Sequence, residues 1–258
     1  MQNLATVLTP EQVVRVHQAS LEILEKVGLL VRNPQARQIF ARYGCRVDEA
    51  TEIVRLPRQV VEEFRSSIPP TFTFYARDPK FDKTLPGDAP VMVTGSSAPN
   101  IIDPLSGHER RATSEDLARI AHLVNALPGH DVFSISTLAE DAPPGLFSIT
   151  RFYTALKNTV KPVRGSGPPE DFEAILKLAF TVAGSEAAYR QHPFVTHHSC
   201  PVVSPLTMDF DSTAALIFYV ERDLPYYPTI VPNAGLTSPL TMVGTLAQGN
   251  AEFLAAAV

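Results

Sequence analysis

Small polar residues follow a series of short apolar segments, and these residues are the first candidates for chemistry. In parallel α/β proteins the reacting groups lie on the loops that leave the carboxyl ends of the strands. The candidates at such positions are Gly95, Ser96, Ser97, Ser136, Ser166, His197, His198 and Asn233. The set is polar but nearly uncharged, and it contains no pair of carboxylates for general acid and base catalysis. The residue types therefore disfavour a hydrolase or glycosidase and favour hydrogen-bonded binding of a small molecule.

The adjacent histidines His197 and His198 are the strongest single signal in this set. Successive side chains of a strand point to opposite faces, so only one of the two can face a binding site. For the same reason the pair cannot chelate one metal ion as a helical i, i+4 pair does, and we predict no metal site. One histidine is then a hydrogen-bond donor or proton carrier for a substrate; the alternative is one core histidine and one loop histidine.

Three other signals are weaker. The segments 95–97 and 165–167 can present backbone N–H groups to an anion, although both lack the lysine and the spacing of a phosphate loop, and ordinary turns explain them equally well. Lys161 has the residue type of a Schiff-base lysine, but it begins a strand beside a proline, which favours a structural role. Asn233 can bind a carboxylate or hydroxyl, or serve a turn.

The elements that must position these residues alternate between short apolar runs and amphipathic helices. Predicted strands cover 91–93, 131–136, 162–164, 194–197 and 226–231; predicted helices cover 113–127, 145–158, 169–183, 208–222 and 239–258. This alternation predicts an α/β fold with about five βα units and a parallel sheet. A doubly wound sheet and part of a (β/α)₈ TIM-type barrel both fit. The absence of a glycine-rich dinucleotide motif favours an incomplete barrel.

An N-terminal helical layer precedes the barrel. Capping signals at Thr9-Pro10, Asn33-Pro34 and Leu56-Pro57 predict the starts of three helices, a strand is predicted at 71–76, and 78–90 is expected to cross to the next region. The sequence between 101 and 111 predicts a small hairpin. We therefore expect two domains: an N-terminal helical region with a short strand segment at 1–90, and a partial TIM-type barrel at 91–258.

The last predicted helix begins after Ser238-Pro239 and keeps an apolar face to Val258 without a stop signal. We therefore expect further barrel units to follow, or another copy of the chain to cover the open sheet edges, which makes a homo-oligomer an expected state.

Composition restricts the partners. The net charge of -5 gives no basic footprint, so we expect no nucleic-acid or membrane partner. No apolar run approaches the roughly 18 residues of a membrane span, and no secretion signal is visible, so we expect a cytoplasmic protein. The two cysteines form neither a disulfide framework nor a zinc motif.

Several stretches, in order, resemble the trimethylamine methyltransferase family. They are 8–28, 103–113, the Lys161-Pro162 pair, 234–240 and 248–254. The resemblance implies a (β/α)₈ barrel with added N-terminal helices. It also implies transfer of a methyl group from trimethylamine, or from a quaternary amine such as glycine betaine, to the cob(I)alamin of a separate corrinoid protein, with no cofactor bound directly. Family members continue well beyond the length of this chain, and some carry pyrrolysine there, so no catalytic residue is assigned by resemblance.

The leading hypothesis is thus a corrinoid-dependent methyltransferase that binds a methylated amine at the strand-end loops. The first alternative is a non-catalytic interaction or oligomer-forming module. The weaker alternative is a TIM-barrel lyase or aldolase that uses Lys161 with His197 or His198.

Overall fold

The computed structural model describes residues 7–87 and 89–258 and divides into two compact units. The first unit comprises Met1–Pro69, Ser199–Glu221 and Tyr227–Val258, and the second comprises Pro70–His198 and Arg222–Tyr226. These units do not follow the predicted regions 1–90 and 91–258, because two late segments of the chain pack with the N-terminal helices. The assignment of domains within a whole barrel stays a prediction.

Helices form most of the first unit. They are α1 (Pro10–Glu22), continued by a π-helical turn (Ile23–Val27), α2 (Pro34–Arg42), α3 (Arg58–Ser67), α8 (Phe210–Val220) and α9 (Met242–Ala257). The predicted caps are confirmed at α1, where Thr9 and Gln12 form a capping box, and at α2, where the Asn33 side chain accepts a hydrogen bond from the Ala36 N–H.

A five-stranded sheet accompanies these helices, so the prediction of a purely helical layer with one strand segment was incomplete. Its order is β11 (Val202–Val203), β12 (Thr207–Met208), β1 (Leu29–Val31), β3 (Ile53–Arg55) and β2 (Arg46–Asp48). β1 pairs parallel with β12 and antiparallel with β3. Each strand has two or three residues, too few for an alternating pattern to be recognised in the sequence.

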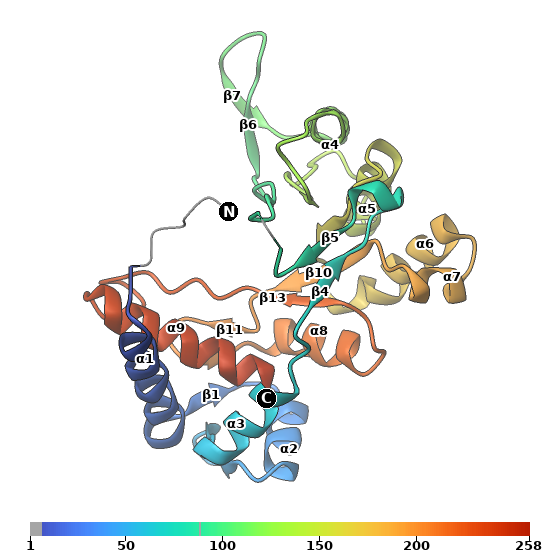
Figure 1. The fold of residues 1–258 in the computed structure, drawn as a ribbon. Coiled ribbons are helices and arrows are strands. Elements are labelled where there is room, and N and C mark those ends of the chain that lie inside the picture. Colours follow the sequence, from blue (N-terminus) through green and yellow to red (C-terminus); the bar gives the residue numbers. More distant parts are fainter. Residues whose placement is uncertain (1–6, 88) are drawn as a thin grey trace. The chain divides into compact units, whose positions relative to one another are not determined.

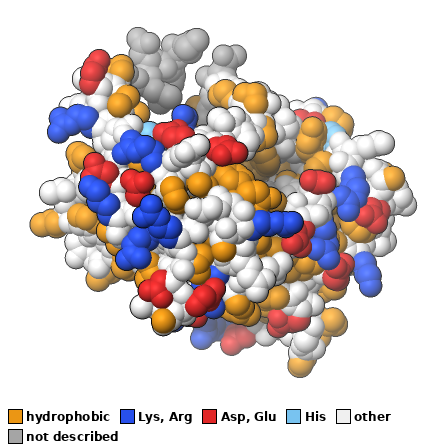
Figure 2. Space-filling view, turned by 90° about the horizontal axis from the view of Figure 1, so that it is seen from below, with side chains coloured by type: hydrophobic (Ala, Val, Ile, Leu, Met, Phe, Trp, Pro, Cys, Tyr) orange, Lys and Arg blue, Asp and Glu red, His pale blue; other side chains and the backbone are white. Residues whose placement is uncertain are grey.

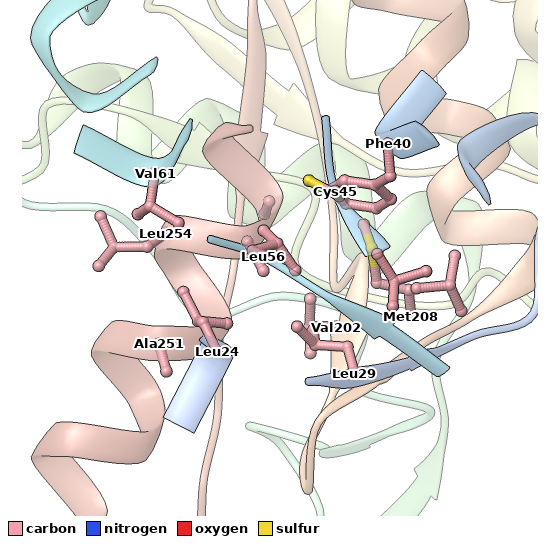
Figure 3. Packing of buried hydrophobic residues seen from close by; sticks show 14 of the residues in the cluster. Leu24, Leu29, Phe40, Cys45, Leu56, Val61, Val202, Met208, Ala251 and Leu254 are labelled. Atoms are coloured by element: carbon pink, nitrogen blue, oxygen red, sulfur yellow. The ribbon is translucent and has the colours of Figure 1, made fainter. Parts of the chain in front are cut away.

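The core of the first unit joins segments from both ends of the sequence. Leu24, Leu29 and Leu56 meet Val202 and Leu254 in a cluster of buried apolar side chains (Figure 3). α9 lies beside α1 (Figure 1), and the Ser20 hydroxyl donates to the Ala247 carbonyl oxygen at 2.8 Å. The folding of residues 7–69 is therefore coupled to that of α9.

The start of α9 differs from the prediction. Thr241, not Ser238, caps the helix by accepting a hydrogen bond from the Gly244 N–H, and the Ser238 hydroxyl instead lies 2.9 Å from the Thr245 hydroxyl. Further along, the fully buried Glu252 carboxylate accepts hydrogen bonds from the Ser204 hydroxyl at 2.6 Å and the Leu206 N–H at 3.0 Å. This carboxylate fastens the loop between β11 and β12 to α9.

Two hairpins and four helices belong to the second unit. The hairpins pair β4 (Phe72–Phe74) with β5 (Lys83–Leu85), and β6 (Asn100–Ile102) with β7 (Glu109–Arg111); the helices are α4 (Ser114–Ala126), α5 (Phe147–Asn158), α6 (Phe172–Ala183) and α7 (Glu186–Gln191), and 3₁₀ turns occur at Pro79–Phe81 and Pro169–Asp171. The predicted hairpin at 101–111 is confirmed, and it extends away from the rest of its unit (Figure 1). The predicted crossing at 78–90 instead contains β5.

Four strands form a sheet whose inner strands are parallel. The order is β13 (Tyr226–Pro228), β10 (Val195–Ser199), β9 (Val163–Gly165) and β8 (Phe133–Ser134). β9 pairs parallel with both β8 and β10. The predicted strand at 91–93 is reduced to an isolated parallel bridge between Val93 and Val132. The prediction of an α/β fold that contains a parallel sheet is confirmed.

Lys161 anchors the amino end of β9. Its side chain is buried, and its ammonium group donates to the carbonyl oxygens of Val124 at 2.8 Å, Leu127 at 2.6 Å and His130 at 2.6 Å. A cation is favourable at the end of α4, where unpaired carbonyl groups concentrate negative charge. Because all three ammonium protons are used, Lys161 is a structural anchor, and the aldolase hypothesis loses its nucleophile.

Charged side chains of both signs are mixed with apolar ones on the face of the molecule drawn in Figure 2. Within residues 7–87 and 89–258, no helix combines the length and the apolar character that a bilayer crossing needs.

We predict that Lys161→Met destabilises the protein by about 2–4 kcal/mol, because methionine fills the space but leaves three carbonyl oxygens without a donor. Lys177, which is exposed on α6, provides the matched control Lys177→Met. Urea unfolding monitored by circular dichroism measures both free energies. Equal stability of the two variants would contradict the anchoring role.

Candidate functional site

The parallel register brings three polar loops to one edge of the second-unit sheet. Ser134 pairs with Arg164, and Arg164 pairs with Thr196, so the segments that follow β8, β9 and β10 leave the sheet at about the same height. Ser136, Ser166 and His198 follow these pairs within two residues. The prediction that the strand ends converge is therefore consistent with the observed register.

The segment containing Gly95, Ser96 and Ser97 adjoins this edge beside β8. The Ser97 N–H donates to the Ile135 carbonyl oxygen at 3.2 Å, and Ala98 forms a parallel bridge with Thr137. Ser97 has a φ of 59°, a left-handed value that serine seldom adopts. Gly95 and Ser96 are exposed. The structure thus places Ser97 next to the Ser136 loop.

Asn233 belongs to the first unit. It is exposed, and its carbonyl oxygen accepts hydrogen bonds from the N–H groups of Leu236, Thr237 and Ser238. Asn233 thus forms a turn, which was the alternative to a binding role in the sequence analysis. Its role in binding stays a prediction, as do the roles of the other candidates.

His197 points into the core. Its ring is 1% exposed and lies against Phe172, at 5.1 Å between centroids, and against Tyr226, at 6.0 Å. Burial, with a smaller contribution from His198, lowers the pKa of His197 to about 3. This imidazole is therefore neutral near pH 7, and its contacts are those of a core histidine.

His198 is the histidine near the edge loops. It is half-buried, and its pKa is lowered to about 4, first by burial and then by the charge of Arg164, with a smaller effect from Arg151. A hydrogen bond to the Gly165 backbone acts in the opposite direction. His198 is thus a neutral hydrogen-bonding group beside two guanidinium groups.

Arg151, on the first turns of α5, is a site candidate that the sequence analysis did not select. Its side chain is only 3% exposed. Its Nε donates to the Thr137 carbonyl oxygen at 3.1 Å, and its guanidinium lies 5.2 Å from the centre of the Phe147 ring. Burial lowers its pKa to about 10, so it remains a cation at neutral pH.

Buried hydroxyl groups accompany Arg151. Those of Ser136, Thr137 and Ser148 have no hydrogen-bond partner among the described residues. Ser148 lies one helical turn before Arg151, and both side chains are buried on the same face of α5. A methyl group at Gly167 would lie 3.1 Å from the Ser148 hydroxyl, so glycine there lets the β9 loop approach α5 closely.

One sequence signal for this cluster was available. Ser148 and Arg151 occupy the helical face that continues with Phe152 and Ala155, where an arginine is out of place unless it has a function or a partner. The sequence could not show that the strand-end loops reach this face, because that contact depends on the register of the sheet.

The arrangement is suited to binding and orienting a small molecule. Among the described residues, no group of three histidine, cysteine or acidic side chains is placed to hold a metal ion. The neutral imidazole of His198, buried hydroxyls and guanidinium groups supply hydrogen bonds and positive charge.

We predict that acid destabilises the protein through His197. Folding lowers the pKa of His197 from 6.5 to about 3. The stability that depends on a neutral His197 is therefore fully present above pH 6.5 and is lost as the pH falls toward 3. From pH 7 to pH 5 the free energy of unfolding falls by about 2 kcal/mol through this residue alone. His197→Phe should remove that part of the pH dependence in urea titrations, whereas His122→Phe, at an exposed position, should not. The same slope in both variants would contradict the assignment.

Comparisons with known proteins agree with the resemblance seen in the sequence. The family model described as "Trimethylamine methyltransferase (MTTB)" matches residues 2–258. A trimethylamine methyltransferase MttB of Desulfitobacterium hafniense (strain DSM 10664 / DCB-2) is 30% identical over 249 residues, which cover 96% of this chain and 50% of the relative.

Two further relatives are named for glycine betaine and for trimethylamine, and the second comes from another genus. A glycine betaine methyltransferase of Desulfitobacterium hafniense (strain Y51) is 31% identical over 252 residues, with 96% of this chain and 52% of the relative covered. Trimethylamine methyltransferase MttB of Methanosarcina thermophila is 29% identical over 258 residues, with 97% and 53% covered. The chain spans about half the length of the curated relatives it matches. With the family model matched along almost all of its length, the chain belongs to the trimethylamine methyltransferase family.

Proposed function

We propose that this protein is a methyltransferase that moves a methyl group from a methylated amine to the cob(I)alamin of a separate corrinoid protein. The observation that carries the proposal is the family match over residues 2–258, with relatives named for trimethylamine and for glycine betaine. The methylated amine is the small-molecule partner and the corrinoid protein is the macromolecular partner. We expect no cofactor to be bound directly by this chain.

The chemistry asks for positioning more than for proton transfer. The carbon–nitrogen bond of the methylammonium group breaks, and its electron pair stays on nitrogen, so the amine leaves as a neutral molecule. The new cobalt–carbon bond uses the electron pair of cob(I)alamin, and no other oxidant or reductant is needed. Enzymes accelerate such a displacement by holding the reacting groups in line and excluding water.

The strand-end loops of the second unit fit that requirement. The imidazole near them, that of His198, has a pKa of about 4, so it is not charged near pH 7 and is not a general acid. The Ser136 hydroxyl is buried and has no hydrogen-bond partner among the described residues. We propose that these loops hold the amine, with His198 as the histidine that contacts it.

The order of the strands supports a TIM-type barrel as the fold of the whole protein. The bridged segment at Val93, then β8, β9, β10 and β13 lie side by side in the order of the sequence. A doubly wound sheet reverses its order at a switch point, whereas a (β/α)₈ barrel does not. We therefore propose that the second-unit sheet is part of such a barrel.

A non-catalytic interaction module is the second candidate. Exposed apolar side chains near α9 favour it, with Leu236 and Leu240 each 83% exposed and Met242 78% exposed. The homo-oligomer, expected from the open sheet edges, stays a prediction. The buried cluster around Arg151 favours the enzyme, because a purely structural module gains nothing from buried hydroxyls without partners.

We predict that the protein, expressed with every residue its gene encodes, forms methylcobalamin from a methylated amine and a corrinoid protein in the cob(I)alamin state. The change in the cobalamin absorption spectrum measures the transfer, and proton NMR identifies the demethylated amine. Reactions without amine, or with heat-treated protein, are the controls. Failure to transfer from tertiary and quaternary amines alike would contradict the proposal.

A further inference from the structure

The hairpin formed by β6 and β7 starts and ends at the edge of the sheet where the candidate site lies. Before β6, the Ala98 N–H donates to the Ser136 carbonyl oxygen at 2.9 Å, and Ala98 forms a parallel bridge with Thr137. After β7, the Ala112 carbonyl oxygen accepts a hydrogen bond from the Glu140 N–H at 2.9 Å. Both feet of the hairpin are therefore fastened to the segment that follows β8, and its tip extends away from the unit (Figure 1).

This hairpin has no core of its own. Every residue from Asn100 to Arg111 is at least partly exposed, and β6 and β7 form a sheet of two strands. A two-stranded hairpin without further packing is only marginally stable in water. Its conformation must therefore be held by specific polar contacts.

Arg110 supplies these contacts. Its Nε donates to the Asp103 carboxylate at the tip at 3.0 Å, and its two terminal nitrogens donate to the Asp116 carboxylate on α4 at 2.7 and 2.8 Å. The Asp103 carboxylate also accepts hydrogen bonds from the N–H groups of Leu105, at 3.0 Å, and Ser106, at 2.9 Å. The Ser106 backbone and then the Arg110 guanidinium lower the pKa of Asp103 to about 2. The tip is thus braced against α4 at neutral pH.

The braced tip presents apolar side chains to solvent. Leu105 is 94% exposed and Ile102 is 66% exposed. A single exposed leucine is ordinary on a protein surface, but a leucine on a rigid, projecting turn loses little conformational entropy when it binds. The exposed charges nearby, Glu109 and Arg111, have opposite signs, so the hairpin is suited to an apolar contact with another protein.

We propose that the hairpin of β6 and β7 is the element on which the corrinoid protein docks, with Leu105 and Ile102 packed against an apolar surface of that protein. The proposal rests on the proposed function, in which the methyl acceptor is a cobalt atom held by a separate protein. It adds the surface that recognises this partner.

The position of the hairpin is the reason for choosing this partner. The corrinoid protein must bring its cobalt to the loops that follow β8, β9 and β10, and the hairpin is fastened at that edge. Three paired residues and a turn reach on the order of 10 Å beyond the feet of the hairpin. A protein that approaches these loops therefore meets the hairpin, whereas a second copy of this chain has no corresponding reason to approach them.

Methyl transfer to two acceptors tests the proposal on the whole protein. The acceptors are free cob(I)alamin and the corrinoid proteins of the same organism, each loaded with cobalamin and reduced. We expect Leu105→Gln to raise the KM for the corrinoid protein about 10- to 100-fold, the factor that corresponds to the buried surface of one leucine. The KM for the amine and the rate with free cob(I)alamin should stay unchanged. Ile102→Gln should act in the same direction.

Leu123→Gln is the matched control. Leu123 is 56% exposed on α4, towards the end of that helix where Lys161 binds the Val124 carbonyl oxygen, and so at the opposite end of the sheet. This variant should leave the KM for both acceptors unchanged. Equal KM values for Leu105→Gln and Leu123→Gln would overturn the proposal, and so would an equal loss of transfer to the corrinoid protein and to free cob(I)alamin.

Two further measurements separate this proposal from its alternatives. If light scattering shows that Leu105→Gln changes the molar mass of the protein while the KM for the corrinoid protein is unchanged, the hairpin joins copies of this chain and the proposal is wrong. Biolayer interferometry measures binding of the corrinoid protein without any reaction. Binding that depends on Leu105, without methyl transfer, would support the docking surface and contradict the proposed reaction. Transfer that does not depend on Leu105 would do the reverse.

Discussion

The parallel pairing of β9 with its two neighbours is the constraint on which the candidate site depends. Val163 lies level with Phe133 on one side and Val195 on the other, so three consecutive loops leave the sheet together. No contact between neighbours in sequence could place Thr137, Gly167 and His198 at one edge. At the opposite end of β9, the ammonium group of Lys161 donates to three carbonyl oxygens. These hydrogen bonds hold the amino end of β9 in place and so help to fix its register.

The two ends of β9 use buried positive charge differently. At the amino end, the ammonium group of Lys161 has a carbonyl oxygen for every proton, which makes burial acceptable and leaves nothing for chemistry. At the carboxyl end, Arg151 has one hydrogen bond within the described chain, and the nearby hydroxyls of Thr137 and Ser148 have none there. A protein keeps an incomplete set of partners where a ligand completes it, which is why the second cation and not the first indicates function.

Local signals in the sequence were sufficient for the long elements. The caps at Thr9 and Asn33, the helix predicted at 113–127 and the strands around 163 and 195 are where the sequence predicts them. The strands of the first unit were missed because two or three residues are too few to show an alternating pattern. The strand Lys83–Leu85 was missed because it lies in a segment rich in proline and charged residues. Arg151 was missed for another reason: whether an arginine is paired is a property of the folded chain, and only the sheet register reveals it.

The most direct measurement is a crystal structure of the protein with a methylated amine bound. The account predicts that the ligand lies at the carboxyl ends of β8, β9 and β10, in contact with the loops that follow these strands and with His198. A ligand at the Lys161 end of the sheet, or one that contacts none of these loops, would contradict it.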